Sequence, residues 1–231
     1  MKFIKAFFLA FFAASVLYVS AVLICIDAPV PAEYWVAEML TVKKELAKEY
    51  AGKRKIIVAG GSSTLFGISA EQASAQLKMP VINYGLHAGL RLEKILQEVS
   101  PFAERGDILV LPLEPGYYGC NTKLTSWQVA NIIGWDHAAW KEMSLIEKGE
   151  FIASISPSQF GQMIIAEFQK KFFPEKVSHR LETMDEKLVL SKFRARTVPD
   201  KLAYSAYNFN NHGDLLRTEG AQYKGPGLHY S

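Results

Sequence analysis

The segment "IIVAGGSSTLFGI", residues 56–68, decides the fold of this chain. A short apolar run that ends in glycines is typical of a buried strand followed by a tight turn. A serine just past such a turn lies near the N-terminus of the next helix, where N–H groups and the helix dipole favour negative charge. Two interpretations of Ser62 therefore stay open: a turn or capping serine, or a nucleophile.

Strands and helices alternate after this segment. The runs "MPVINYG" and "GDILVLPLE" predict further strands within residues 79–85 and 106–114. Helices are expected over residues 70–77, capped by Ser69, and over residues 90–103. Strands separated by helices predict an α/β fold with a parallel sheet. Ligands bind beyond the carboxyl ends of such strands, so three turns are expected to form one site: Gly60 to Thr64, Asn83 to Gly89 and Glu114 to Tyr118.

The N-terminus predicts a membrane anchor. Lys2 and Lys5 precede residues 6–26, a run of 21 residues without a charge, and about 20 apolar residues cross a bilayer. The lysines are expected to stay in the cytoplasm, which places the rest of the chain in the periplasm, on a single pass through the inner membrane. A cleaved signal peptide is the alternative, although residues 19–29 offer no convincing cleavage site.

Residues 27–54 connect the anchor to the α/β domain. Pro29 and Pro31 make a short, stiff linker, and residues 33–50 predict an amphipathic helix. Its apolar positions include Trp35, Met39, Leu40 and Leu46. The helix is expected to pack against the domain, with a place along the membrane surface as the alternative.

The second half of the chain is expected to be more helical. Helices are predicted over residues 124–135, 136–148 and 156–173, and a further strand over residues 187–193. Its aromatic side chains are expected to form core rather than a ligand site: Trp127, Trp135, Trp140, Phe160 and Phe168. Residues 194–231 are polar and irregular, which suggests that the domain at 55–231 is incomplete at its C-terminus.

Composition excludes several classes of protein. The 231 residues are 49% apolar, enough for one ordinary domain, and 26 basic against 23 acidic side chains give no reason to expect a nucleic-acid partner. The two cysteines, Cys25 and Cys120, are not expected to pair, and Cys120 is expected to be a free thiol. The glycine-rich segment lacks the phosphate-loop and dinucleotide patterns. No cofactor or metal is expected.

The segment "VAGGSSTLFG" resembles the first conserved block of SGNH/GDSL hydrolases, where a strand ends in Gly-Asp-Ser or Gly-Gly-Ser. "VINYGLHAGL" resembles the second block, and "GDILVLPLEPGYY" occupies the place of the third. The resemblance covers residues 55 to about 118 and implies a flavodoxin-like, three-layer SGNH fold. It implies that Ser62 is the nucleophile, followed by Ser63, and that the N–H of Gly89, or alternatively Gly85, helps to form an oxyanion hole.

Two positions depart from the family pattern. The third block normally supplies an Asn that donates to the oxyanion, and Glu114 stands there, although an ionised carboxylate cannot donate. The last block needs Asp-x-x-His, and no Asp in this chain has a His three residues on. His212 is the candidate base, with Asp214 as its partner, against a plain loop histidine as the alternative. The catalytic pair could also lie beyond Ser231.

The resemblance implies a membrane-anchored esterase or O-acyltransferase that acts on envelope glycans, similar to proteins of polysaccharide O-acetylation and teichoic-acid D-alanylation. The alternative is a non-catalytic scaffold or binding component of an envelope assembly, or an inactive fragment. The expected partners are the bilayer, through residues 6–26, and an acylated glycan or envelope-assembly proteins.

Overall fold

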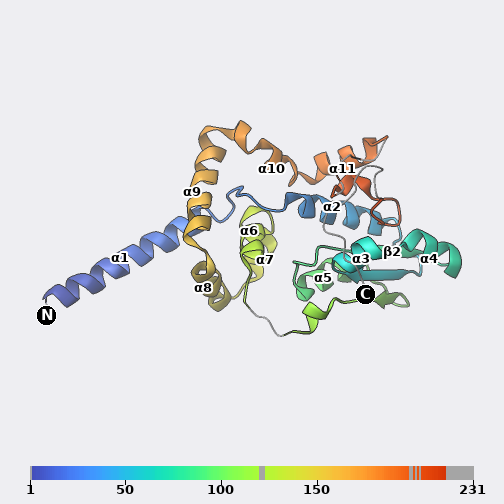
Figure 1. Ribbon diagram of the computed structural model, residues 1–231, viewed down its shortest axis with the longest axis horizontal. Helices are drawn as coiled ribbons and strands as arrows, with labels where there is room; N and C mark the ends of the chain where they lie inside the picture. The colour runs from blue at the N-terminus through green and yellow to red at the C-terminus, as the bar shows by residue number, and fades with distance from the viewer. Residues whose placement is uncertain (1, 120–122, 198–199, 201, 203, 217–231) are drawn as a thin grey trace, which may run out of the picture. The chain divides into compact units, whose positions relative to one another are not determined.

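A computed structural model describes residues 2–119, 123–197, 200, 202 and 204–216 (Figure 1). The chain forms two compact units. Unit 1 combines Met1–Ala37 with Asn121–Asp185, and unit 2 combines Glu38–Cys120 with Glu186–Ser231. The segment 55–231, expected to be one domain, therefore contributes to both units.

Unit 2 contains a three-stranded parallel sheet. Its strands are β1 (Ile56–Gly60), β2 (Val81–Gly85) and β3 (Ile108–Val110), in the order β2-β1-β3. Ile56 pairs with Val81 on one side and with Ile108 on the other. The three predicted strands and the α/β class are confirmed.

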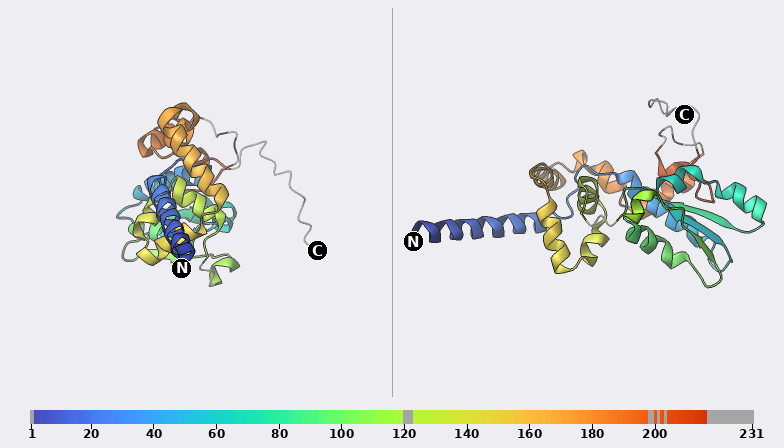
Figure 2. Two further views of the ribbon diagram at one scale, coloured as in Figure 1. Left: turned by 90° about the vertical axis from the view of Figure 1, so that its left-hand side faces the viewer. Right: turned by 60° about the horizontal axis from the view of Figure 1, so that its bottom comes forward.

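Unit 2 also contains helices. They are the part of α2 (Tyr34–Lys48) from Glu38 on, α3 (Ser62–Gly67), α4 (Ala70–Leu77), α5 (Leu92–Val99) and α11 (Glu186–Ala195), with 3-10 turns η1 (Ser100–Phe102), η2 (Pro115–Tyr118) and η4 (Ala206–Asn208). Of these helices, α3, α4 and α5 contact the strands. Right-handed crossovers in the order β2-β1-β3 place α4 and α5 on opposite faces of the sheet, as Figure 2 shows. Ser69 caps α4 as predicted, because its Oγ accepts the Gln72 N–H at 3.3 Å.

The strand predicted at residues 187–193 is wrong, because this segment lies within helix α11. Val189 and Phe193, four residues apart, are its buried positions. A short apolar run such as "LVL" fits either a strand or one face of a helix, and here the helical spacing decides.

Helix α2 packs as predicted. Met39, Leu40 and Leu46 are buried, together with Val36 and Val42. The amphipathic pattern of residues 33–50 therefore reflects a face that is covered by protein.

Unit 1 is helical. It contains α1 (Lys2–Ile24), α6 (Ser126–Gly134), α7 (His137–Glu142), α8 (Leu145–Ser154), α9 (Pro157–Phe172) and α10 (Ser178–Glu182), with a 3-10 turn η3 (Pro174–Lys176). Reciprocal capping boxes begin three helices, Thr125 with Gln128 for α6, Ser144 with Glu147 for α8 and Ser156 with Gln159 for α9. The cap at Ser144 divides the predicted helix 136–148 into α7 and the start of α8.

The core of unit 1 joins the end of α1 to α6, α8 and α9. Its buried apolar residues are Val22, Cys25, Ala28, Val30, Val129, Ile132, Ile133, Phe151, Ile155, Met163 and Ala166. Trp140 and Phe160 pack against it as expected. The prediction is wrong for Phe168, whose side chain is 55% exposed.

Helix α1 is long enough and apolar enough to cross a membrane. Almost none of its apolar surface is covered by protein, since Val22 is its one buried residue.

Candidate functional site

Ser62 lies at the carboxyl edge of the sheet, where the sequence placed it. It is the first residue of α3 and is half-buried, and Gly61 separates it from the last residue of β1. The helix sits very close to the strands. A Cβ on Gly60 would lie 2.3 Å from Thr64 Oγ1, and one on Gly85 would lie 2.3 Å from Leu65 N. Glycine at 60 and 85 therefore allows α3 to pack directly on β1 and β2.

The carboxylate of Glu114 lies at the N-terminus of α3. The N–H of Ser63 donates to Glu114 Oε1 at 2.8 Å. A Cβ on Gly61 would meet Oε1 at 2.6 Å and the Tyr117 hydroxyl at 2.7 Å. The second glycine of the pair thus makes room for two side chains of the protein itself.

The Glu114 carboxyl is ionised at neutral pH. Burial would raise its pKa, but hydrogen bonds from the backbone and side chain of Ser63 and the backbone of Gly61 outweigh burial and lower it. Burial, and then the negative charge of Glu114, raise the pKa of Tyr117 to about 12, so this phenol stays neutral. The edge beside Ser62 therefore carries a fixed negative charge where an oxyanion would need positive potential.

The side chain of Asn83 links β2 to α3 and to the residue after it by hydrogen bonds. Its side-chain amide donates to Thr64 O at 3.2 Å and to Ile68 O at 3.0 Å. Its Oδ1 accepts the N–H of Gly85 at 2.8 Å. Asn83 is fully buried, and these bonds give its amide a structural role. The N–H of Gly85, one of the two candidate oxyanion donors, is already used here.

The N–H of Gly89, the other candidate donor, is also used. It donates to Nδ1 of His87 at 3.0 Å. Since Nδ1 accepts this bond, the proton of the neutral His87 ring is on Nε2. The same loop reaches the Glu114 side of the edge, because the Tyr117 hydroxyl donates to Ala88 O at 3.4 Å.

His212 lies at the other end of the sheet from Ser62. Its Nδ1 is 3.0 Å from Val81 O, at the amino end of β2, and 3.3 Å from Ser74 Oγ. Val81 pairs with Ile56, the first residue of β1, whereas Ser62 follows the last residue of that strand. Four strand residues separate the two ends by about 13 Å. The structure therefore does not bring His212 and Ser62 together.

Asp214 caps helix α4. Its Oδ1 accepts the Ala70 N–H at 2.7 Å and its Oδ2 accepts the Glu71 N–H at 2.9 Å. A carboxylate that binds the first free N–H groups of a helix stabilises that end of the helix. Asp214 thus supports the fold, and its carboxylate is not bonded to the His212 ring.

Sequence reasoning missed two members of this edge, Tyr117 and His87. Both lie in segments expected to form a site, but His87 is two residues past β2 and Tyr117 is seven past β3, and a sequence pattern fixes no direction for a side chain beyond the end of a strand. Cys120 and His229 lie outside the described residues. Within the described part of the chain, His, Cys, Asp and Glu form no group of three that could hold a metal ion.

The fold and the edge define a class: an α/β protein with a short parallel sheet, a serine at the carboxyl end of its central strand, and an N-terminal helix of membrane-spanning length. No protein-family model, curated protein or solved structure matches the chain.

Proposed function

We propose that this chain is a membrane-anchored scaffold or binding component with an SGNH-like α/β unit whose described residues do not form a catalytic set. The observation that carries the proposal is the 2.8 Å hydrogen bond from the Ser63 N–H to the Glu114 carboxylate. An anion of the protein occupies the N-terminus of α3, which is where an acyl-transfer site would have to receive the charge of a tetrahedral intermediate.

The charges beside Ser62 oppose catalysis. Attack of the Ser62 hydroxyl on an ester would create a second negative charge at the helix end that already binds the Glu114 carboxylate, and like charges repel each other in a partly buried site. The N–H groups of Gly85 and Gly89 are already bonded to Asn83 and His87. Stabilising an oxyanion would first require breaking these bonds.

Neither His87 nor His212, the two described histidines of unit 2, is held as the base of a Ser-His-Asp triad would be. The Nδ1 of His212 faces Val81 O at the far end of β2. The Nδ1 of His87 accepts from Gly89, so the ring is held in the tautomer opposite to the one that a Ser-His-Asp triad uses. We infer that the α/β unit presents a surface to an envelope assembly, with α1 in the inner membrane and the unit in the periplasm.

A fluorophosphonate probe, which reacts with activated serines, tests this proposal on the full chain in detergent. We expect no labelling of the wild-type protein above that of Ser62→Ala, and equal rates of 4-nitrophenyl acetate hydrolysis by the two. Ser63→Ala is the matched control for the neighbouring hydroxyl. Labelling that Ser62→Ala abolishes and Ser63→Ala preserves would contradict the proposal.

The second candidate is a serine esterase or O-acyltransferase acting on envelope glycans. The position of Ser62, at the start of a helix just past the carboxyl end of the central strand, favours it. If Ser62-dependent labelling appears, His87→Ala and His212→Ala identify the base. Loss of labelling in His212→Ala alone would support the base predicted from the sequence, and loss in His87→Ala alone would assign that role to the residue on the same sheet edge.

A further inference from the structure

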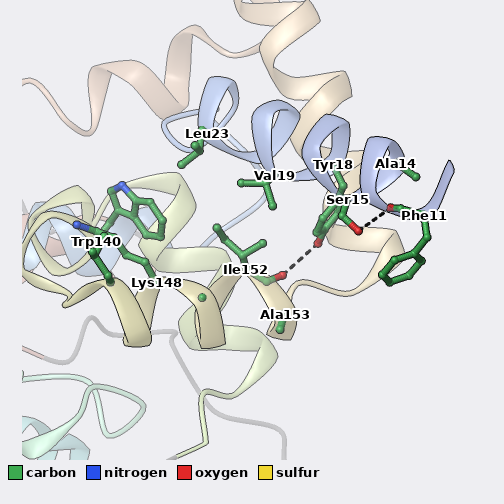
Figure 3. Close-up of a pocket in the computed structure, with 12 residues that line it drawn as sticks. Phe11, Ala14, Ser15, Tyr18, Val19, Leu23, Trp140, Lys148, Ile152 and Ala153 are labelled. Atoms are coloured by element: carbon green, nitrogen blue, oxygen red, sulfur yellow. Dashed lines mark hydrogen bonds between the residues drawn. The ribbon is translucent and has the colours of Figure 1, made fainter. Parts of the chain in front are cut away.

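The C-terminal third of α1 is packed against α8 and α9 within unit 1. The Tyr18 hydroxyl donates to Ile152 O of α8 at 3.1 Å. The Tyr18 ring lies 5.0 Å from the Phe160 ring of α9. Figure 3 shows that Tyr18, Val19 and Leu23 face Ile152 and Trp140 across a groove of about 700 Å³.

These contacts fix the depth of α8 and α9 relative to α1. Tyr18 lies eight residues before the end of the uncharged run at residue 26, which is about 12 Å along a helix. When α1 spans a bilayer, Tyr18 lies inside the spanning segment or at its border. Ile152 and Phe160, which contact Tyr18, must then lie at the level of the lipid interface or below it.

Both helices expose large apolar side chains. Leu145, at the start of α8, is 87% exposed and lines the groove beside α1. On α9, Ile165, Phe168 and Phe172 are each more than half exposed. Their spacing of three and four residues places them on one face, which points away from the core positions Met163 and Ala166.

Helix α9 lies between α1 and the helices α6 and α7 in unit 1. Figure 1 shows α9 crossing the C-terminal end of α1, with α6 and α7 on the far side of α9, and the right-hand view of Figure 2 agrees. Lysines accompany the apolar face. Lys171 Nζ lies 5.6 Å from the Phe172 ring, and Lys176 Nζ lies 5.0 Å from the Phe173 ring.

We propose that Leu145 of α8 and Ile165, Phe168 and Phe172 of α9 form a second membrane contact, an interfacial surface that lies in the headgroup region around α1. Aromatic and aliphatic side chains beside lysines are the composition of helices that lie in the membrane interface. The lysine ammonium groups extend toward lipid phosphates while their stems cover apolar surface. Anionic phospholipid is the partner that this combination of charge and apolar area fits.

This arrangement deepens the role of the anchor, and it does not depend on whether Ser62 is reactive. A single spanning helix can rotate and tilt freely, whereas α1 with an interfacial surface holds unit 1 in one orientation at the bilayer. The groove between α1 and α8 then opens toward acyl chains, which can fill it.

The test places an environment-sensitive fluorophore on the full chain in phospholipid vesicles. Phe168→Cys and Phe172→Cys, in a background with Cys25→Ala and Cys120→Ser, report the interfacial surface. Gln162→Cys is the control, because Gln162 is an exposed polar position on the same helix. We expect blue-shifted emission that nitroxide-labelled lipids quench at positions 168 and 172, and water-like emission with little quenching at position 162.

Water-like, unquenched emission at 168 and 172 would overturn the proposal. Blue-shifted emission that lipid nitroxides do not quench would also overturn it, because a protein partner or a second copy would then cover this surface. Lys171→Gln should weaken the quenching at position 168 in vesicles that contain anionic phospholipid and leave it unchanged in purely zwitterionic vesicles. If Lys171→Gln leaves the quenching at position 168 unchanged in the anionic vesicles as well, the role of the lysine is contradicted.

Discussion

The two outer strands of the three-stranded sheet, β2 and β3, differ in how their outer sides are covered. At the β2 edge, the N–H of Asn83 donates to His212 O at 2.8 Å, and the Lys43 ammonium donates to Asn83 O and Gly213 O at 2.7 and 2.6 Å. At the β3 edge, the apolar side chains of Ile108, Leu109 and Val110 are 41–43% exposed. Among the described residues, backbone hydrogen bonds join β3 to β1 and to Lys55 on its inner side.

This difference shows what covering a strand requires. An uncovered edge presents free N–H and C=O groups that can pair with another chain. The β2 edge is covered by a polar loop, and the loop is held by a lysine that is only 1% exposed. The Lys43 stem passes through the core, and Nζ lies 4.6 Å from the Phe209 ring. The segment that contains His212 and Asp214, the candidate catalytic pair, thus covers this edge instead.

The largest expected effect comes from removing the Lys43 amine. Lys43→Met keeps a long apolar stem but leaves Asn83 O and Gly213 O buried without this donor, which should cost about 2–5 kcal/mol. All four tryptophans lie in unit 1, so tryptophan fluorescence would miss the change. Hydrogen exchange at residues 81–85 of the full chain in detergent measures the loss of stability.

Lys44→Met is the control. Lys44 is a partly exposed partner of Glu98, so its substitution should cost less than about 1 kcal/mol. Equal protection of β2 in both variants would contradict this account.

The next effect is a pH dependence of the same edge. Burial lowers the pKa of Lys43 to about 7, although the charge of Asp214 opposes the shift. Between about pH 7 and its ordinary value near 10.5, the unfolded chain binds a proton at Lys43 that the folded chain does not, so stability rises with pH across this window. Each unit of the pKa difference contributes about 1.4 kcal/mol to the stability.

Hydrogen exchange measures this dependence. Protection of the backbone N–H of Asn83, corrected for intrinsic exchange, should increase from pH 7 to pH 10. Lys43→Met should remove this slope, and a slope that persists in the variant would assign it to another group.

The smallest effect on stability is expected at the open edge. Leu109→Lys places a charge on an exposed strand and should change unit 2 by less than about 1 kcal/mol. Because an edge lysine opposes pairing between chains, the variant should self-associate less than the wild-type protein in light scattering at low detergent. Ile82→Lys, at a buried position of β2, is the matched contrast and should unfold the unit. Undiminished association of Leu109→Lys would mean that β3 is not the surface through which the chains associate.

The amino-acid sequence determined the elements and their order. Apolar runs bounded by glycine or proline located the three strands, and Ser69 begins the helix that it was expected to cap. The caps at Thr125 and Ser156 lie at the starts of two other expected helices, whereas the cap at Ser144 falls inside the helix expected over residues 136–148. These features are local, because strand periodicity and capping depend on residues within one or two turns. The strand expected at 187–193 shows the limit, since a short apolar run fits two periods and only packing separates them.

Tertiary structure alone decided the character of the site. The sequence placed Ser62, Asn83, Gly89 and Glu114 near the carboxyl ends of the strands, and they lie there. Whether the N–H groups at these strand ends stay free depends on which side chains fold back onto them. Asn83 and His87 bond glycines only two residues away, whereas Glu114 reaches Ser63 across 51 residues of sequence. His212 and Asp214 lie close together in the chain, yet one covers a strand and the other caps a helix. A short stretch of sequence fixes which groups are near one another, but the hydrogen-bond partner of each buried group is chosen by the whole fold.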